Sequence, residues 1–268
     1  MKTRAVVTTS LFLLAAACSQ DRNEAQPTAE DSAPPREPQV SIYAAALASD
    51  QRPESDRESD ASRKPDAVLA FFGIAPGDVV LEMWAGGGYY TELLSHIVGE
   101  NGKVYAHANT PILNFAGDAH PNRHADNRLP NTEILMAENN ELALEPDSFD
   151  AVTIILNYHD LYWSSEQYGW ETIDVPAFIA EIHKGLKPGG VLGIVDHRAE
   201  PGSPAASGNT LHRIDPAVVI ADLESAGFVL DAESDMLANP GDEHAKNVFD
   251  EAVRGNTDRF VLRFLKPE

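Results

Sequence analysis

The sequence predicts an α/β fold in which a mostly parallel sheet carries helices on both faces. Two observations lead to this prediction. Short apolar runs alternate along most of the chain with segments whose apolar residues recur at helical spacing, as in strand–helix–strand units. Two further apolar runs, 229–237 and 258–266, then follow each other without a helical segment between them, which indicates that the last strand is inserted antiparallel.

The individual elements can be placed in chain order. A helical segment interrupted at Pro53 and Pro65 comes first, and the polar, turn-rich stretch 109–131 is expected to hold at most one short helix. Asp174 and Asp215 are candidate N-caps, each followed within two residues by a proline. The predicted strands are 79–84, 104–108, 132–138, 148–156, 191–197, 229–237 and 258–266, and the predicted helices after the first segment are 90–97, 174–187 and 215–226.

The N-terminus carries the pattern of an export signal. Residues 1–17 combine two early basic residues with an apolar run that is too short for a membrane-spanning helix. The segment ends in small residues before Cys18, the only cysteine of the chain, and resembles a bacterial lipoprotein signal. This resemblance implies a lipidated Cys18 on the periplasmic side of the envelope, and Ser19 favours the outer membrane. An ordinary secretory signal with an incidental cysteine is the alternative.

The remaining chain divides into a tether and one domain. Residues 18–40 contain four prolines and almost no large apolar side chains, so they are expected to be a disordered tether. Residues 41–268 are expected to form a single domain with an N-terminal helical extension, 41–72. The formal net charge of −22 argues against nucleic acid as a partner, and a membrane contact is expected through the lipid anchor alone.

A run of three glycines marks the first candidate site. In LEMWAGGGYYTELLSHI, residues 81–97, an apolar strand is followed by Gly86, Gly87 and Gly88 and then by an amphipathic helix. Glycines at this point allow a sharp turn and let a ligand approach bare main-chain amides. A dinucleotide fingerprint would need a further glycine inside the helix, where Thr91 stands. A tight strand–helix turn without a ligand is the other alternative.

The wider pattern resembles a known family. PGDVVLEMWAGGGYYTELLS, GKVYAHAN, SFDAV and EIHKGLKPGGVLGIVDH occur in that order, and this succession is similar to class I S-adenosylmethionine-dependent methyltransferases. The resemblance covers about residues 65–266. It implies a Rossmann-like, seven-stranded sheet with a final antiparallel strand, S-adenosylmethionine as the cofactor, and transfer of a methyl group to an unknown small-molecule or protein acceptor.

The resemblance also assigns cofactor-binding positions around the first strand. Glu82 matches the acid that ends this strand in the family, and Gly86 and Gly88 match two of the motif glycines. Trp84 stands in the place of the first motif glycine, close to the methionine end of the cofactor. Asn109 occupies the region where the family carries an acid for the ribose hydroxyls, and an amide binds a hydroxyl without the strength of a carboxylate.

Further positions follow the third, fourth and fifth strands. Glu138 and Asn139 fall where the family contacts adenine, and Asn157 begins the loop that faces the methyl group and the substrate. The resemblance places the substrate at this loop, where Tyr158 and Trp163 could form a wall for it or only pack beneath the loop. His197, at the end of the fifth strand, is expected at the same rim and is a further candidate for substrate contact.

Two histidine sites have alternative interpretations. His159 and Asp160 are the candidate catalytic pair, in which His159 accepts a proton, although His159 could instead only bind local backbone. His120 and His124 lie four residues apart between acids and could hold a metal in a hydrolase, or they could belong to a solvated loop. A non-catalytic binding module that retains the methyltransferase fold in the cell envelope is the alternative function.

Overall fold

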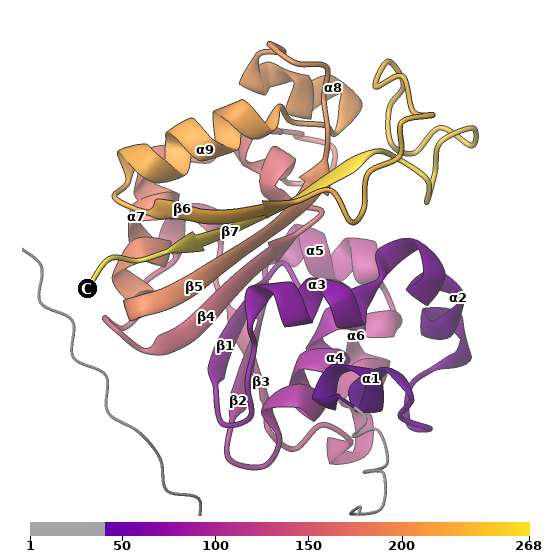
Figure 1. Ribbon diagram of the computed structural model, residues 1–268, viewed down its shortest axis with the longest axis vertical. Helices are drawn as coiled ribbons and strands as arrows, with labels where there is room; N and C mark the ends of the chain where they lie inside the picture. Colours follow the sequence, from indigo (N-terminus) through magenta and orange to yellow (C-terminus); the bar gives the residue numbers. More distant parts are fainter. Residues whose placement is uncertain (1–40) are drawn as a thin grey trace, which may run out of the picture. The chain divides into compact units, whose positions relative to one another are not determined.

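The computed structural model describes residues 41–268, which contain a seven-stranded sheet (Figure 1). The predicted signal peptide, the tether and Cys18 lie outside the described residues. None of the helices among residues 41–268 is both long enough and apolar enough to cross a membrane.

The strand order is β3-β2-β1-β4-β5-β7-β6. Strand β7 runs antiparallel to both of its neighbours, and the other pairs are parallel. The predicted Rossmann-like, mostly parallel sheet with a final antiparallel strand is therefore confirmed. The strands are β1 (Val79–Met83), β2 (Lys103–Ala108), β3 (Thr132–Met136), β4 (Phe149–Ile155), β5 (Leu186–His197), β6 (Val229–Ser234) and β7 (Arg259–Leu265).

Helices cover both faces of the sheet. Figure 1 shows α1, α3 and α4 on one side and α7 and α9 on the other, and each set buries its own apolar cluster against the strands. The α-helices are α1 (Ile42–Leu47), α2 (Glu54–Arg63), α3 (Pro65–Phe72), α4 (Tyr89–Val98), α5 (Thr110–Ala116), α6 (Ala119–His124), α7 (Val175–Gly185), α8 (Gly208–Leu211) and α9 (Pro216–Ser225). Short 3₁₀ turns are η1 (Ala125–Asn127), η2 (Asn139–Glu141), η3 (Tyr158–Tyr162) and η4 (Ala205–Ser207).

Both predicted N-caps are formed by the expected side chains. Asp174 accepts a hydrogen bond from the amide of Ala177, and Asp215 accepts one from the amide of Ala217. Each satisfies an amide that lacks a partner in the first turn of its helix. Strand β5 begins earlier than predicted, because Leu186 already pairs with Phe149 of β4.

Residues 109–131 form more structure than the sequence suggested. The segment contains α5, α6 and a 3₁₀ turn, where at most one short helix was predicted. Asn109 caps α5 by accepting from the amide of Ile112. Helix α6 is held from outside the segment, because Arg123 pairs with Glu92 of α4. Because this ion pair joins segments that are distant in the sequence, the local sequence pattern predicted fewer helices than residues 109–131 contain.

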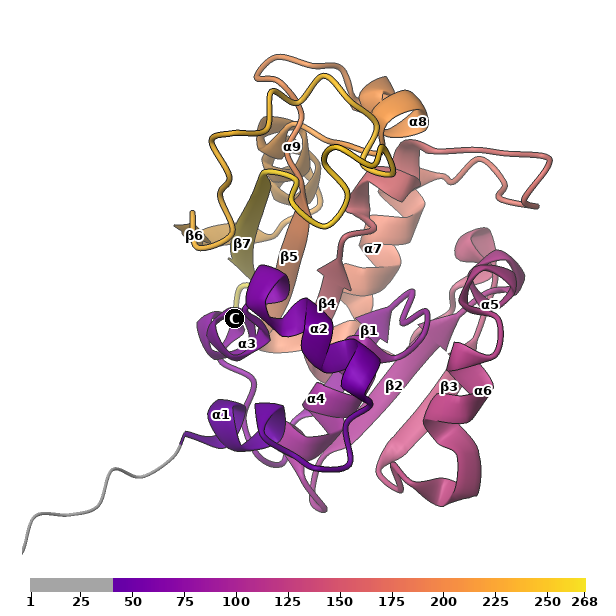
Figure 2. The same cartoon turned by 90° about the vertical axis from the view of Figure 1, so that its right-hand side faces the viewer.

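The topology defines where a ligand can bind. Strand order reverses between β1 and β4, since β1 is followed by β2 on one side while β4 leads to β5 on the other. In open α/β sheets a crevice forms beyond the carboxyl ends of the strands at such a point. Figure 2 shows α2 passing in front of these central strands.

Candidate functional site

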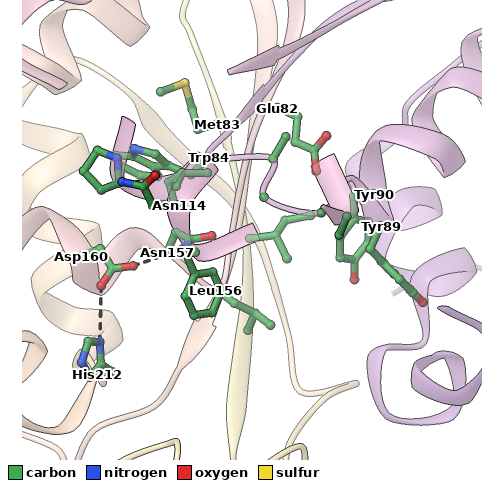
Figure 3. A pocket seen from close by; sticks show the side chains of 18 of the residues that line it. Glu82, Met83, Trp84, Tyr89, Tyr90, Asn114, Leu156, Asn157, Asp160 and His212 are labelled. Atoms are coloured by element: carbon green, nitrogen blue, oxygen red, sulfur yellow. Dashed lines mark hydrogen bonds and ion pairs between the residues drawn. The ribbon is translucent and has the colours of Figure 1, made fainter. Parts of the chain in front are cut away.

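A cavity of about 1380 Å³ occupies this crevice (Figure 3). Its wall combines the turn between β1 and α4, helices α2, α5 and α6, the loop after β4, and residues of the later loops. Glu82 and Tyr90 lie toward one side of the view, and Trp84, Asn157, Asp160 and His212 lie toward the other. The cavity therefore connects the glycine turn to the polar residues that follow β4.

Helix α6 packs closely against the glycine turn. Gly86 and Gly88 have φ values of +56° and +79°, which favour glycine. A Cβ at Gly88 would lie 2.6 Å from Cγ of Arg123, whose Nε donates a 2.9 Å hydrogen bond to the carbonyl of Gly87. The backbone of Gly87 and Gly88 is thus partly occupied by contacts with Arg123 of α6.

The wall of the cavity includes a buried carboxyl group. Glu82 is 5% exposed, and its Oε2 accepts a 2.5 Å hydrogen bond from the hydroxyl of Thr91. Burial raises the pKa of Glu82 to about 8, although the hydrogen bond from Thr91 opposes this shift. Glu82 can therefore be a neutral donor or a carboxylate near physiological pH.

Trp84 lies in the apolar core and reaches the cavity wall. Its ring stacks on Phe178 with a centroid separation of 5.1 Å and an interplanar angle of 2°. Its Nε1 donates a 2.9 Å hydrogen bond to Oδ1 of Asn139. The backbone of Trp84 has φ +50°, the left-handed region in which a motif glycine would be unstrained. The indole thus takes the glycine's backbone conformation and adds a packed side chain.

The residues predicted to bind the adenosine part of the cofactor do not line the cavity. Asn109 is fully buried and donates from Nδ2 to the same oxygen of Asn139, at 2.9 Å. Its own Oδ1 caps α5. Glu138 instead accepts hydrogen bonds from the amide and hydroxyl of Thr110. The amide groups of Asn109 and Asn139 are therefore bonded to each other within the chain, and the exposed Glu138 is bonded to Thr110.

The predicted catalytic pair lies on the opposite side of the cavity. Nδ1 of His159 is 2.8 Å from Oδ1 of the fully buried Asp196, and Nε2 of His159 is 3.3 Å from Oδ1 of Asp160. Asn157 donates a 3.1 Å hydrogen bond to the other oxygen of Asp160. The imidazole of His159 is thus held between two carboxylates.

This environment changes the expected role of His159. Burial disfavours its charged form, but the carboxylates of Asp160 and Asp196 outweigh burial and raise the pKa of His159 to about 10. Burial opposes ionisation of Asp160 as well, yet the neighbouring His159 holds its pKa well below the usual range. Without a cation beside these carboxylates, His159 is therefore protonated at neutral pH, which disfavours the predicted role as a proton acceptor.

A second histidine, His212, joins this pair and was missed by sequence reasoning. Its Nδ1 lies 3.4 Å from Oδ1 of Asp160, the oxygen that also faces His159. His212 has φ +52° and packs between the rings of Trp163 and Phe249. It lies far along the chain in an irregular segment, so no local pattern marked it. Trp84, Leu156 and His212 are all non-glycine residues with positive φ, and all three line the cavity.

The predicted substrate residues lie in different places. Trp163 and His197 line the cavity, and Nδ1 of His197 is 2.6 Å from the hydroxyl of Thr257. Tyr158 is fully buried, and its hydroxyl donates to Asp222 of α9, away from the cavity.

The two histidines of α6 do not form a cluster of three metal-binding groups. Their rings are 5.1 Å apart, and Nδ1 of His120 lies 3.0 Å from the carbonyl of Gly86. Within residues 41–268, the group of three side chains that is suitable for a metal ion consists of His159, Asp160 and His212.

Comparison with protein families supports the predicted resemblance. The family model for a methyltransferase domain matches residues 81–194, which include the glycine turn, the loop after β4 and most of β5. This part of the chain is thus similar to a methyltransferase domain, and the match supports S-adenosylmethionine as the cofactor. A comparison with curated protein sequences gave no match.

Solved structures share the fold. A methyltransferase from Aquifex aeolicus described as SAM-dependent has 22% sequence identity and a TM-score of 0.56, and the match covers 80% of this chain and 98% of that one. An S-adenosylmethionine-dependent methyltransferase from Mesorhizobium loti has 14% identity and a TM-score of 0.52, with 77% and 99% covered.

A third similar structure is phosphoethanolamine N-methyltransferase 2 from Haemonchus contortus in complex with S-adenosyl-L-methionine. It has 16% identity and a TM-score of 0.54, with 75% of this chain and 52% of that chain covered. At these identities the likeness establishes the fold alone.

Proposed function

We propose that this chain is an S-adenosylmethionine-dependent methyltransferase that acts on a small-molecule or protein acceptor. The observation that carries the proposal is the single cavity that joins the glycine turn of the matched domain to the polar loop after β4. A methyl donor and an acceptor must occupy one connected space for in-line transfer.

The glycine-turn end of the cavity fits this cofactor. Its main chain at Gly86 and Gly87 has no side chain to block a ligand, and the carboxyl group of Glu82 lies in the same wall. Glu82, the turn and Asn157 are the groups that would hold the cofactor, which supplies a methyl group on a positively charged sulfur. The described structure offers no carboxylate after β2 for the ribose hydroxyls, so the fit is strongest at the methionine end.

The opposite end of the cavity is suited to an acceptor. The carboxylate of Asp160 can accept a hydrogen bond from a hydroxyl or amine, and Trp163 provides an aromatic wall. The loop is fixed by the hydrogen bond from Asn157 to Asp160 and by the contact of His159 with Asp196. Holding the acceptor in one orientation reduces the entropic part of the barrier to transfer.

Calorimetry tests this proposal directly. S-adenosylmethionine and S-adenosylhomocysteine are titrated into the purified protein, and we expect one molecule to bind with a Kd in the micromolar range. At about pH 9, where the Glu82 carboxyl group is ionised, Glu82→Gln is expected to weaken binding about tenfold or more, because it removes a charge at the cavity wall. Glu133→Gln, at an exposed acid on β3, is the matched control and should bind like the wild type. Absence of binding to either ligand would favour the non-catalytic binding module.

The proposed cellular location rests on the N-terminal sequence. We propose that the chain is exported and held on the periplasmic side of the outer membrane by a lipid on Cys18. Cys18→Ser should abolish incorporation of a labelled fatty acid, and unchanged labelling would contradict the anchor.

A further inference from the structure

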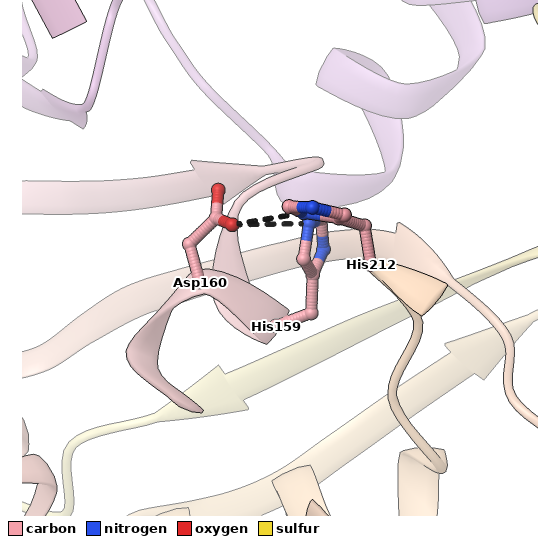
Figure 4. A group of neighbouring side chains, drawn as sticks. All are labelled: His159, Asp160 and His212. Carbon is pink, nitrogen blue, oxygen red and sulfur yellow. Dashed lines mark ion pairs between the residues drawn. The ribbon is translucent and has the colours of Figure 1, made fainter. Parts of the chain in front are cut away.

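The group formed by His159, Asp160 and His212 has the dimensions of a metal site (Figure 4). One oxygen of Asp160 lies 3.3 Å from Nε2 of His159 and 3.4 Å from Nδ1 of His212, and the three atoms lie within 4.8 Å of one another. A tetrahedral site with bonds of about 2.1 Å has edges of about 3.4 Å, so two of these separations already match.

The two contacts to Asp160 are long for simple charge-assisted hydrogen bonds, which are about 2.7–2.9 Å. The contact from His159 to Asp196, at 2.8 Å, does have that length. His159 therefore uses Nδ1 for a strong hydrogen bond and leaves Nε2 directed at the shared oxygen of Asp160.

The surroundings hold the three side chains in place. Metal-binding histidines commonly donate their second ring N–H to a carboxylate, which fixes the orientation of the ring. Asp196 has this position behind His159, and Asn157 holds the second oxygen of Asp160 at 3.1 Å. His212 is fixed instead by aromatic packing against Trp163 and Phe249.

We propose that His159, Asp160 and His212 bind a divalent transition-metal ion at the acceptor end of the cavity. Two imidazoles and one carboxylate are a common ligand set for zinc and iron, and sites with three protein ligands leave a position open for water or substrate. All three side chains line the cavity, so the open position faces the space in which an acceptor would bind. The nearby carboxylates of Asp160 and Asp196 also favour a cation at this point.

A bound ion gives this end of the cavity a specific chemical use. A divalent metal lowers the pKa of a coordinated hydroxyl or thiol, which makes that group a better nucleophile. The acceptor class would then be a molecule with an oxygen or sulfur that coordinates the ion. This use rests on the proposed function, whereas metal binding itself does not.

The test uses the full chain, purified without a histidine tag and stripped with a chelator. Zn²⁺ is titrated by calorimetry, and Co²⁺ is followed by its visible absorption. We expect one equivalent of either ion to bind. His212→Gln and Asp160→Asn should each weaken Zn²⁺ binding by about 100-fold or more, and Asp196→Asn by about 10–100-fold, because it removes only the support of His159.

His124→Gln is the matched control, since it removes a histidine from the other candidate metal loop. It should leave Zn²⁺ affinity unchanged, and thermal unfolding of each variant without metal shows whether it is folded. Failure of the wild-type chain to bind either ion, or loss of binding in His124→Gln but not in His212→Gln, would overturn the metal site.

Titration with S-adenosylhomocysteine separates the two proposals. Zinc binding without S-adenosylhomocysteine binding would support the metal site and contradict the proposed function. S-adenosylhomocysteine binding without zinc binding would do the reverse.

Discussion

The two ends of the cavity differ in how their polar side chains are used. Beside the end near β2 and β3, Asn109 and Asn139 do not line the cavity, and they bond to each other and to neighbouring groups inside the chain. At the end after β4, Asp160 and His212 face the cavity. The glycine motif of the sequence marks the first end, whereas the spacing of Asp160 and His212 along the chain matches no recognisable motif.

This difference shows that a motif locates a site better than it identifies the groups that are free to bind. The glycine turn lies where the motif predicts, yet part of its open backbone contacts α6 through Arg123. The group of His159, Asp160 and His212 comes from two loops that are distant in the sequence. These loops lie side by side only because the sheet pairs β4 with β5.

The largest expected effect concerns the packing of Trp84. Trp84→Ala should lower the free energy of unfolding by about 3–5 kcal/mol, because it empties a core site that is 3% exposed. Trp84→Gly removes the same side chain but suits the left-handed backbone at φ +50°. We therefore expect Trp84→Gly to be about 0.5–1 kcal/mol more stable than Trp84→Ala in denaturant unfolding. The reverse order would show that backbone strain at Trp84 is unimportant.

The second expected effect is a pH dependence that comes from Glu82. Its pKa is raised from 4.5 to about 8 in the folded chain, so the folded state binds more protons than the unfolded state between these values. The contribution of Glu82 to the free energy of unfolding therefore falls as the pH rises through this window, by up to about 1.4 kcal/mol per pH unit.

Denaturant unfolding of wild type and Glu82→Gln at pH 5.5 and pH 8 measures this effect. The wild type should lose stability relative to the variant as the pH rises, since glutamine stays neutral. Glu133→Gln is the control at an exposed acid. A difference between wild type and Glu82→Gln that does not change with pH would contradict the raised pKa.

The third effect compares two glycines with similar backbone angles. Gly88 and Gly73 are both left-handed, with φ and ψ of +79° and 25° in one and +77° and 23° in the other. A Cβ at Gly88 would lie 2.6 Å from Cγ of Arg123, while a Cβ at Gly73 would meet no atom within 4 Å. Gly73→Ala should cost about 1 kcal/mol from backbone strain, and Gly88→Ala about 2–3 kcal/mol because crowding is added. Equal losses in thermal unfolding would show that α6 can move away from the turn.

The sheet was predictable from the sequence, because buried strands and capped helices leave local patterns. Asp174 and Asp215 mark helix starts by side chains next to the helices they cap. The position of the cavity followed from the glycine turn and the loop after β4. Asn109 bonds to Asn139 rather than facing the cavity, and Tyr158 points toward Asp222 of α9. His212 lies beside Asp160 although the two are distant in the sequence. These arrangements depend on contacts between distant segments, so the sequence could not reveal them.

The smallest effect tests whether Asn109 could be turned into the acid that the family carries. Asn109→Asp keeps an oxygen to cap α5, and a negative charge at a helix N-terminus is mildly favourable. It also removes the Nδ2 donor and places a carboxylate oxygen against Oδ1 of Asn139. We therefore expect a net loss of about 1 kcal/mol in denaturant unfolding and no gain in S-adenosylmethionine affinity, with Asn101→Asp at an exposed turn before β2 as the control. Tighter cofactor binding by Asn109→Asp would mean that this side chain can turn into the cavity. Polar side chains would then be available to a ligand at both ends of the cavity. The two ends would differ only in the ligand that they bind.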